Sequence, residues 1–255
     1  MTEDTAEASG AHIAVHWKEE EYYQPPAKFV AQANASDPAI LEQYTEDKFP
    51  ECFEAYANLL TWDKKWDTVL DTSNAPFWKW FVGGELNASY NCVDRHLADK
   101  ANKAALIWVP EPEDEAHQAI TYRELYVRVN EFAAVLKSLG LKAGDRITFH
   151  MPMVPELPVA MLAAARLGVI HSQVFGGFSG AAAGHRIADS GSNVLVTMDG
   201  YYRSGDLVDH KIKADEAVET AAKEGQHVDK VLVFRRYPGL YSSATPMVEG
   251  RDVFV

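Results

Sequence analysis

The most regular pattern of apolar and polar positions lies between residues 141 and 187. Its first part alternates and ends at two prolines, which exclude regular structure, and a run rich in the good helix formers Ala, Leu and Met follows. Gly168 comes directly after that run, where a helix commonly ends. The pattern predicts a strand at 147–150, a helix at 156–167, a strand at 169–175 and a second helix that begins near Ser179.

Strands and helices also alternate on either side of this stretch. Short apolar runs predict strands, and amphipathic stretches predict helices, the first of which opens on a capping-box signature from Thr121 to Glu124. The further strands are predicted at 104–109, 193–198 and 230–234, and the further helices at 121–139 and 207–223. Such alternation indicates repeated β-α-β units. The sequence therefore predicts an α/β fold with a mostly parallel sheet and helices on both faces, preceded by a helical N-terminal wrap.

The first hundred residues carry a different pattern. Residues 1–20 contain few apolar side chains and predict a disordered tail. Residues 21–100 predict short helices, with no strand signal between 22 and 70 and with one helix start at Asp37-Pro38. Helices this short cannot bury an apolar face alone, so we expect them to wrap over a larger body. The expected domains are 1–20, 21–100 and 101–255, the last being the first α/β part of a larger, incomplete domain.

Charge and cysteine content exclude several classes of function. The chain has 24 basic and 37 acidic residues, a net charge of −13, and so lacks the basic stripe that binds nucleic acid. Neither a secretory signal nor an apolar run of membrane-spanning length is visible. Cys52 and Cys92 are too isolated for a disulfide framework or a metal pattern. We expect a cytoplasmic protein with reduced cysteines, no membrane and no nucleic-acid partner.

Two loops at predicted strand ends are the candidate binding residues. Gly176 and Gly177 follow the strand at 169–175, where bare backbone permits close approach of a ligand, although a tight turn alone would also explain them. The segment 199–206, DGYYRSGD, follows another strand and should lie at the same sheet edge. Arg203 in this segment is able to grip a phosphate with two hydrogen bonds, or is an exposed surface arginine. We predict the two turns to lie side by side.

No catalytic or metal-binding residue is predicted. The chain contains neither GxxxxGK[ST] nor GxGxxG, GxSxG or HExxH. His150 and His171 fall on predicted strands and are interpreted as hydrogen-bonded structural histidines. Asp94, Arg95 and His96 are consecutive on a helix and point in different directions, so they indicate local hydrogen bonding. The aromatic cluster at 77–81 is interpreted as packing.

Three stretches carry a family resemblance. They are FWKWFVGGELNASYNCVDRHL, ITYRELYVRVNEFAAVLKSLGLKAGDRI and MPMVPELPVAMLAAARLGVIHSQVFGGFS. They closely resemble the N-terminal part of AMP-forming acetyl-CoA synthetases, members of the adenylate-forming superfamily, and the similarity runs from about Trp17 to the C-terminus. The first stretch is the most specific, because GGELNASYNCVDRH is similar to the acetyl- and propionyl-CoA synthetase branch.

The resemblance implies a ligase that works in two steps. A carboxylate attacks the α-phosphate of ATP, with Mg²⁺ neutralising charge, and the CoA thiol then displaces AMP. It also implies that the loop of Arg203, Ser204, Gly205 and Asp206 contacts the nucleotide end of CoA, with Gly176 and Gly177 beside it. Asp206 departs from the family, which usually has a basic residue there, and its carboxylate would repel the CoA phosphate. His185 is a smaller departure, at a position where the family often has an aspartate.

Several parts of the family's active site have no counterpart in these residues. The phosphate loop, the acyl pocket, the ribose-binding aspartate and the catalytic lysine would all lie beyond Val255. We therefore expect an N-terminal portion of an acetate–CoA ligase that is inactive as this chain alone, with ATP and Mg²⁺ sites outside it. One alternative is a stand-alone CoA-binding or interaction module, which would bind CoA weakly through Arg203 or pair with a separately encoded C-terminal half. The other is a portion of a propionate–CoA ligase.

Overall fold

The computed structural model describes residues 24–35, 37–238 and 246–255. It divides into two compact units, Met1–Asn58 and Leu59–Val255, and each is described by itself. The predicted disordered tail at 1–20 lies outside the described residues. No helix in the three described ranges is both long enough and apolar enough to cross a membrane. The expected domain bounds stay a prediction.

The first unit consists of short helical turns. Asp37 begins one of them, because its side chain accepts a hydrogen bond from the Ala39 backbone at 2.9 Å, as predicted. The Tyr44 ring stacks on Tyr56 with centroids 5.6 Å apart. The longest of the later turns begins as a 3₁₀ helix at Glu51 and continues as an α-helix to Ala57. In order, the elements are α2 (Ala27–Ala31), η1 (Pro38–Tyr44), η2 (Glu46–Lys48), η3 (Glu51–Phe53) and α3 (Glu54–Ala57).

The second unit opens with a small hairpin that the sequence pattern did not predict. Strands β1 (Thr68–Asp71) and β2 (Lys79–Val82) pair antiparallel, so the expectation of no strand before residue 70 is wrong. The Phe81 ring packs against Trp66 at 5.0 Å, whereas Phe77 is 74% exposed. Packing therefore accounts for only part of the aromatic cluster. Helical turns follow: α4 (Ala88–Cys92), η4 (Asp94–His96) and α5 (Leu97–Lys100).

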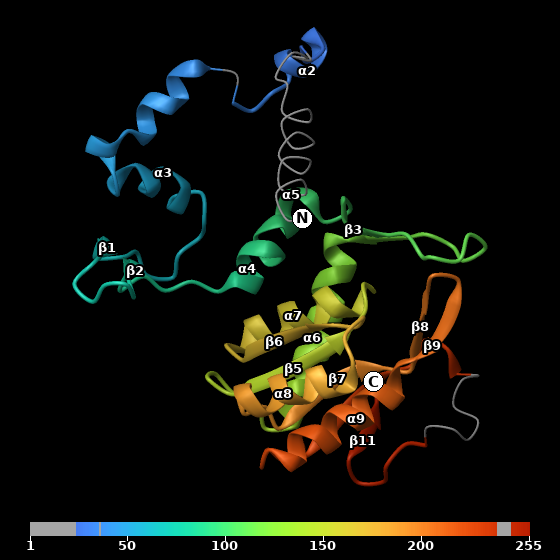
Figure 1. Cartoon of the computed structure of the whole chain (residues 1–255). Coiled ribbons are helices and arrows are strands. Elements are labelled where there is room, and N and C mark those ends of the chain that lie inside the picture. The colour runs from blue at the N-terminus through green and yellow to red at the C-terminus, as the bar shows by residue number, and fades with distance from the viewer. Residues whose placement is uncertain (1–23, 36, 239–245) are drawn as a thin grey trace, which may run out of the picture. The chain divides into compact units, whose positions relative to one another are not determined.

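A five-stranded parallel sheet forms the centre of the second unit (Figure 1). Its strand order is β11-β10-β7-β5-β6. The strands are β5 (Arg146–Met151), β6 (Ile170–Phe175), β7 (Val194–Met198), β10 (Lys230–Phe234) and β11 (Asp252–Phe254). All five residues of β7 are buried, as expected for a strand covered on both faces.

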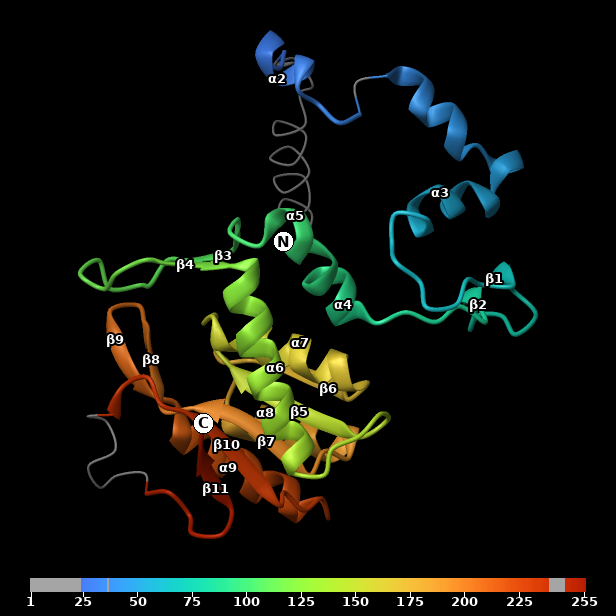
Figure 2. The same cartoon turned by 180° about the vertical axis from the view of Figure 1, so that it is seen from behind.

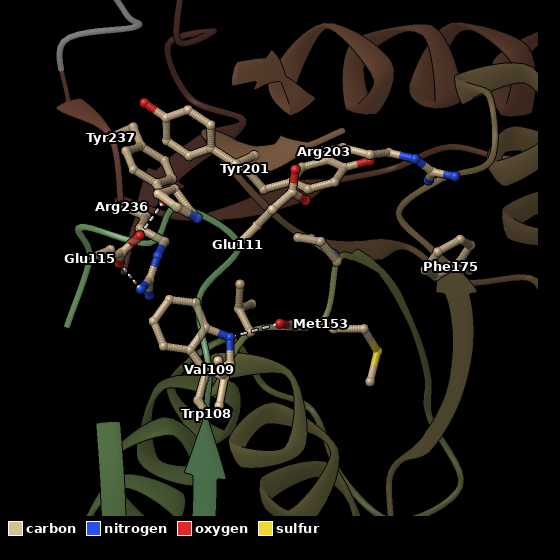
Figure 3. A pocket seen from close by; sticks show the side chains of 14 residues that line it. Trp108, Val109, Glu111, Glu115, Met153, Phe175, Tyr201, Arg203, Arg236 and Tyr237 are labelled. Carbon is tan, nitrogen blue, oxygen red and sulfur yellow. Dashed lines mark hydrogen bonds and ion pairs between the residues drawn. The ribbon is translucent and has the colours of Figure 1, made fainter. Parts of the chain in front are cut away.

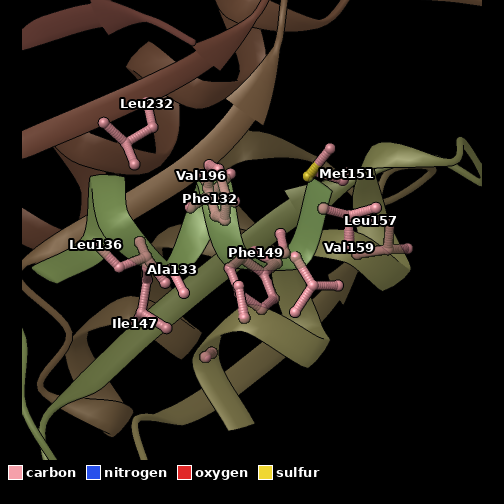
Figure 4. Packing of buried hydrophobic residues seen from close by; sticks show 14 of the residues in the cluster. Phe132, Ala133, Leu136, Ile147, Phe149, Met151, Leu157, Val159, Val196 and Leu232 are labelled. Atoms are coloured by element: carbon pink, nitrogen blue, oxygen red, sulfur yellow. The ribbon is translucent and has the colours of Figure 1, made fainter. Parts of the chain in front are cut away.

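Helices cover both faces of this sheet, which confirms the predicted fold class. Helices α6 (Tyr122–Ser138) and α7 (Glu156–Leu167) pack together on one face, and α8 (Gly180–Ser190) and α9 (His210–Lys223) pack together on the other (Figure 2). Each face has its own apolar cluster. Ile147, Phe149 and Met151 alternate along β5 and point into the cluster under α6 and α7 (Figure 4).

Two predicted elements are placed differently. Strand β3 (Ala104–Trp108) lies outside the large sheet and pairs antiparallel with β4 (Gln118–Thr121), while β11 takes the fifth place in the large sheet. Residues 207–209 belong to a strand rather than to the first turn of α9. The reason is Asp209, whose side chain caps α9 by accepting from the Ile212 backbone at 3.3 Å, so the helix begins at His210.

Helices α8 and α9 approach closely because small residues face each other. A Cβ atom added at Gly184 would lie 2.5 Å from the Thr220 Cβ and 2.7 Å from the Ala217 carbonyl oxygen. Gly184→Val is therefore expected to lower the free energy of unfolding by about 1–3 kcal/mol in a urea titration. Asp189→Val, which adds the same residue at an exposed position of α8, should change it by less than about 0.5 kcal/mol. Equal losses in the two variants would contradict this packing argument.

Candidate functional site

The strand order places a switch point between two neighbouring strands. From β5 the chain adds β6 on one side, and then β7, β10 and β11 on the other. In open α/β sheets, ligands bind at the carboxyl ends of the strands at such a point. The segments that follow β5, β6, β7 and β10 all meet at this edge.

A cavity of about 300 Å³ lies at that edge (Figure 3). Its walls combine the loop after β3 with the segments that follow β5, β6, β7 and β10, and five of its side chains are aromatic. The lining residues are Trp108, Val109, Glu111, Pro112, Glu115, Pro152, Met153, Val154, Phe175, Tyr201, Tyr202, Arg203, Arg236 and Tyr237. Met153 and Val109 are largely exposed, so the cavity opens to solvent beside apolar surface.

The segment at 199–206 is part of a hairpin rather than a loop. Strands β8 (Gly200–Arg203) and β9 (Asp206–Asp209) pair antiparallel. Ser204 and Gly205 form the turn with positive φ values of 54° and 84°, as a two-residue hairpin turn of the primed type requires. The hairpin sets Arg203 directly opposite Asp206 in the register.

The two predicted strand-end turns lie side by side, as expected. A Cβ atom added at Gly177 would overlap the Nη1 atom of Arg203 and would lie 2.5 Å from the Phe175 Cε1 atom. The Arg203 guanidinium also lies over the Phe175 ring, 5.4 Å from its centroid. Within the described ranges Arg203 forms no ion pair with a carboxylate. The guanidinium of Arg203, which is available to a ligand, therefore lies against the main chain of Gly177.

The turn before α8 is held by side chains from two other elements. The Gly176 carbonyl accepts hydrogen bonds from the Tyr201 hydroxyl at 3.0 Å and from Lys213 Nζ at 3.2 Å. Glu216 accepts from the Gly180 backbone at 3.1 Å. Because the side chain of Ser179 caps the helix as well, the first turn of α8 is already occupied, and Gly177 is the open part of this turn.

Two buried histidines lie at the same end of the sheet. His210 Nε2 donates to the His150 carbonyl at 2.9 Å, and the ring centroids are 4.5 Å apart. Burial lowers the pKa of His210 to about 3 and, with help from the Lys213 ammonium, that of His150 to about 4, so both are neutral at pH 7. Neither ring nitrogen of His150 has a hydrogen bond of standard geometry within the described residues. A weaker hydrogen bond with the Phe178 backbone raises the His150 pKa and so opposes part of the shift. The hydrogen bond predicted for the His150 imidazole is thus reduced to this weaker interaction with the Phe178 backbone.

A second arginine in the cavity was not predicted. Arg236 pairs with Glu115 at 2.6 Å and with Glu156 at 3.6 Å, and it stacks on the Trp108 ring at 4.1 Å. The Tyr237 hydroxyl donates to Glu115 at 3.0 Å. Because two carboxylates neutralise Arg236, it is part of the wall rather than a free cation like Arg203. Its position directly after a parallel strand was the available signal in the sequence.

The remaining candidates have structural roles. Asp94 forms an ion pair with Arg166, 72 positions away, and Arg95 donates to the Leu59 carbonyl at 2.7 Å, 36 positions away. The predicted hydrogen bonding is present, but it is long-range rather than local. His171 stacks beside Phe149 at 5.4 Å, and burial lowers its pKa. Within the described part of the chain, no group of three or more His, Cys, Asp or Glu side chains is arranged to hold a metal ion.

Comparison with known proteins gives two family matches. Residues 93–249 match the AMP-binding enzyme family, and residues 40–92 match the acetyl-coenzyme A synthetase N-terminus. The chain is 50% identical over 194 residues to the acetyl-coenzyme A synthetase of Methanothrix soehngenii, which covers 76% of this chain and 28% of that protein.

Two further relatives extend this result. The chain is 42% identical over all 255 residues to the acetyl-coenzyme A synthetase of Mycobacterium tuberculosis H37Rv, which is 36% of that protein. It is 45% identical over 202 residues to the 3-hydroxypropionyl-coenzyme A synthetase of Sulfurisphaera tokodaii, which covers 79% of this chain and 30% of that protein. The chain therefore spans between 28% and 36% of the length of these relatives.

Proposed function

The chain belongs to the AMP-binding enzyme family. We propose that it is the part of an acetate–CoA ligase that binds the nucleotide end of CoA. The proposed reaction of the whole ligase converts acetate, ATP and CoA to acetyl-CoA, AMP and pyrophosphate. Relatives named acetyl-coenzyme A synthetase support this choice of acid. One similar relative is named for 3-hydroxypropionate, so a propionate-type acid is the alternative substrate.

The observation that carries the proposal is the guanidinium of Arg203 lying on the bare backbone of Gly177. A guanidinium binds a phosphate through two parallel hydrogen bonds, and a glycine lets a ligand approach the main chain closely. The aromatic wall beside it includes Tyr201, Tyr202 and Phe175, and stacking of a nucleic-acid base on such rings contributes about 1–3 kcal/mol. Ser204 and Gly205 complete the hairpin end that faces the same ligand, whereas the carboxylate of Asp206, opposite Arg203, would repel its phosphate.

The proposal does not extend to ATP and Mg²⁺. The described residues hold no cluster for a divalent cation, so they do not fit Mg²⁺, and the 255 residues contain no GxxxxGK[ST] segment. We propose that this chain by itself forms no acyl-adenylate. Cys52 and Cys92 are free, in keeping with a cytoplasmic protein whose ligands are small molecules.

Arg203→Ala tests the proposed CoA contact. Loss of a charge-assisted bidentate contact should weaken CoA binding by about 10- to 30-fold in isothermal titration calorimetry. Arg128→Ala removes the same charge from an exposed position of α6 and should leave the affinity within about twofold of the wild type. CoA binding that is unchanged in Arg203→Ala, or equally weakened in both variants, would overturn the assignment.

The alternative function is a stand-alone CoA-binding or interaction module. It is favoured by the same absence of an ATP phosphate loop from the 255 residues. ATP–pyrophosphate exchange with acetate tests the inactivity that both readings share: exchange catalysed by the purified chain would refute it. CoA binding without exchange fits both readings, and an in-frame phosphate-loop segment in the DNA directly downstream would support the ligase portion over the module.

A further inference from the structure

An acidic strap forms one wall of the cavity. We use this name for residues 109–117, which connect β3 to β4 and are visible beside the labelled Glu111 and Glu115 in Figure 3. Glu115 holds one part of the strap to the end of β10 through Arg236 and Tyr237. Glu111 holds the other part to the hairpin, because its Oε1 accepts a hydrogen bond from the Gly205 backbone at 2.7 Å. The strap thus joins segments that are far apart in the sequence.

The two attachments differ in strength. Glu115 shares a charged hydrogen bond with Arg236, whose side chain is only 11% exposed, and accepts a second one from a tyrosine. Glu111 is an exposed side chain with a single hydrogen bond to a main-chain amide. A single exposed contact is worth much less than a shielded, charged pair. Release of the strap should therefore begin at Glu111, with Glu115 as the fixed end.

The group that accepts the hydrogen bond of the Gly205 amide is the negatively charged carboxylate of Glu111. Turns that present backbone N–H groups outward bind phosphate and other anions, and the Gly205 amide lies in a turn with two positive φ values. A carboxylate oxygen on that amide stands where a phosphate oxygen of a ligand would bind. Arg203, two residues earlier, forms no ion pair with Glu111 among the described residues.

We propose that Glu111 competes with the phosphate of the ligand for the Gly205 amide. Its carboxylate accepts the Gly205 hydrogen bond in the free protein and is displaced when a phosphorylated ligand binds at Arg203. The inference rests on the proposed function, whose regulation it describes. A phosphate oxygen on the Gly205 amide would take the position of the Glu111 carboxylate, and two negative groups repel each other there. The strap would open at this end and leave the amide to the ligand.

The first experiment measures CoA affinity of the full chain by calorimetry. Removing the competitor in Glu111→Ala should tighten CoA binding by about 5- to 10-fold, because the ligand no longer has to displace a charged acceptor. Glu111→Gln keeps an acceptor without the charge and should fall between Glu111→Ala and the wild type. Glu113→Ala removes the same charge from an exposed position of the strap and should stay within about twofold of the wild type.

A second experiment uses inorganic phosphate and follows the Gly205 amide by ¹H–¹⁵N NMR. The Glu111→Ala variant should show a shifted Gly205 signal, and phosphate should move that signal at a lower concentration than in the wild type. A Gly205 signal that phosphate does not move in either protein would overturn the proposal. So would CoA affinities that are equal in Glu111→Ala and Glu113→Ala.

The two experiments separate this inference from the proposed function. If Arg203→Ala abolishes CoA binding while Glu111→Ala leaves it unchanged, the CoA site stands and the competitor role falls. The converse outcome is that CoA binds neither the wild type nor Glu111→Ala, while phosphate shifts the Gly205 signal at a lower concentration in Glu111→Ala. In that case the CoA assignment falls and the competitor role stands.

Discussion

Gly177→Val is expected to bind CoA about 100-fold more weakly than the wild type while losing less than about 1 kcal/mol of stability. A side chain at this position overlaps the Arg203 guanidinium and crowds the Phe175 ring, so it removes both the cation and the close approach to the backbone. Arg203 and Phe175 are exposed and are able to move aside, which is why the fold should tolerate the change. The effect should exceed that of Arg203→Ala, which removes the cation alone.

The neighbouring glycine provides a matched control. A Cβ atom at Gly176 would lie 2.8 Å from the Pro152 backbone nitrogen and 3.0 Å from the Met151 carbonyl carbon. Backbone atoms in a packed strand end cannot move aside as exposed side chains do, so Gly176→Val should cost about 1–3 kcal/mol of stability. Calorimetry with CoA and urea unfolding of both variants would test the contrast. Weakened binding in Gly177→Val accompanied by an equal loss of stability would contradict a role in binding.

The centre of the fold was predictable because its signals are local. The helix α7 ends at Gly168, which has a φ of 71°, and the strands on either side of it are short apolar runs. Both features act within a few residues, so the chain order of β5, α7 and β6 followed from the sequence. The capping box of α6 is equally local, with Thr121 and Glu124 exchanging hydrogen bonds as predicted.

Strand pairing was predicted less well because distant segments decide it. The apolar run of β3 predicts a strand of the large sheet, yet its Ile107 is 73% exposed and, among the described residues, β3 pairs with β4 alone. Strand β11 has three residues, too few for a periodic signal. The hairpin of β8 and β9 left a signal in Ser204-Gly205 between two runs of strand-forming residues, which would have predicted it.

The binding site, like the fold, has one part that could be predicted from the sequence and one part that could not. Gly177 and Arg203 each follow a parallel strand, and the carboxyl ends of parallel strands share one edge, so their proximity followed from chain order. The contact of Glu111 with Gly205 joins residues 94 positions apart through a loop whose path no local pattern specifies. The predicted binding roles of Arg203 and Gly177 stay predictions, which the variants described above test, and that of Asp206 stays a prediction as well.

The largest effect on stability is expected from a substitution in a buried network of charged side chains. Lys211, which has no exposed surface, binds Asp215 at 2.7 Å and Asp252 at 2.8 Å, and Arg251 pairs with the same two carboxylates. Lys211 and Asp215 belong to α9, whereas Arg251 and Asp252 lie at the edge strand β11. Since β11 has only three residues, this network is a main attachment of the strand to the rest of the sheet.

Lys211→Met is expected to lower the free energy of unfolding by about 3 kcal/mol at pH 7, because it leaves Asp252 buried with one cation fewer. The value is at the lower end for a buried pair, since Asp215 is 27% exposed and water screens part of its charge. Lys223→Met removes a lysine from an exposed position of the same helix and should change stability by less than about 0.5 kcal/mol. Urea unfolding of both variants gives the comparison.

The pH dependence distinguishes lost charge pairing from lost packing. Burial alone would raise the pKa of Asp252, but hydrogen bonds from Arg251, Lys211 and the Val248 backbone outweigh it and lower that pKa. A carboxyl whose pKa is lowered by folding stabilises the protein above its unfolded pKa of about 3.9, and this contribution is lost as the pH falls through the folded value. The stability gap between the wild type and Lys211→Met should therefore narrow below about pH 4. A gap that stays constant from pH 7 to that range would show that packing of the lysine chain, rather than its charge, holds β11 in place.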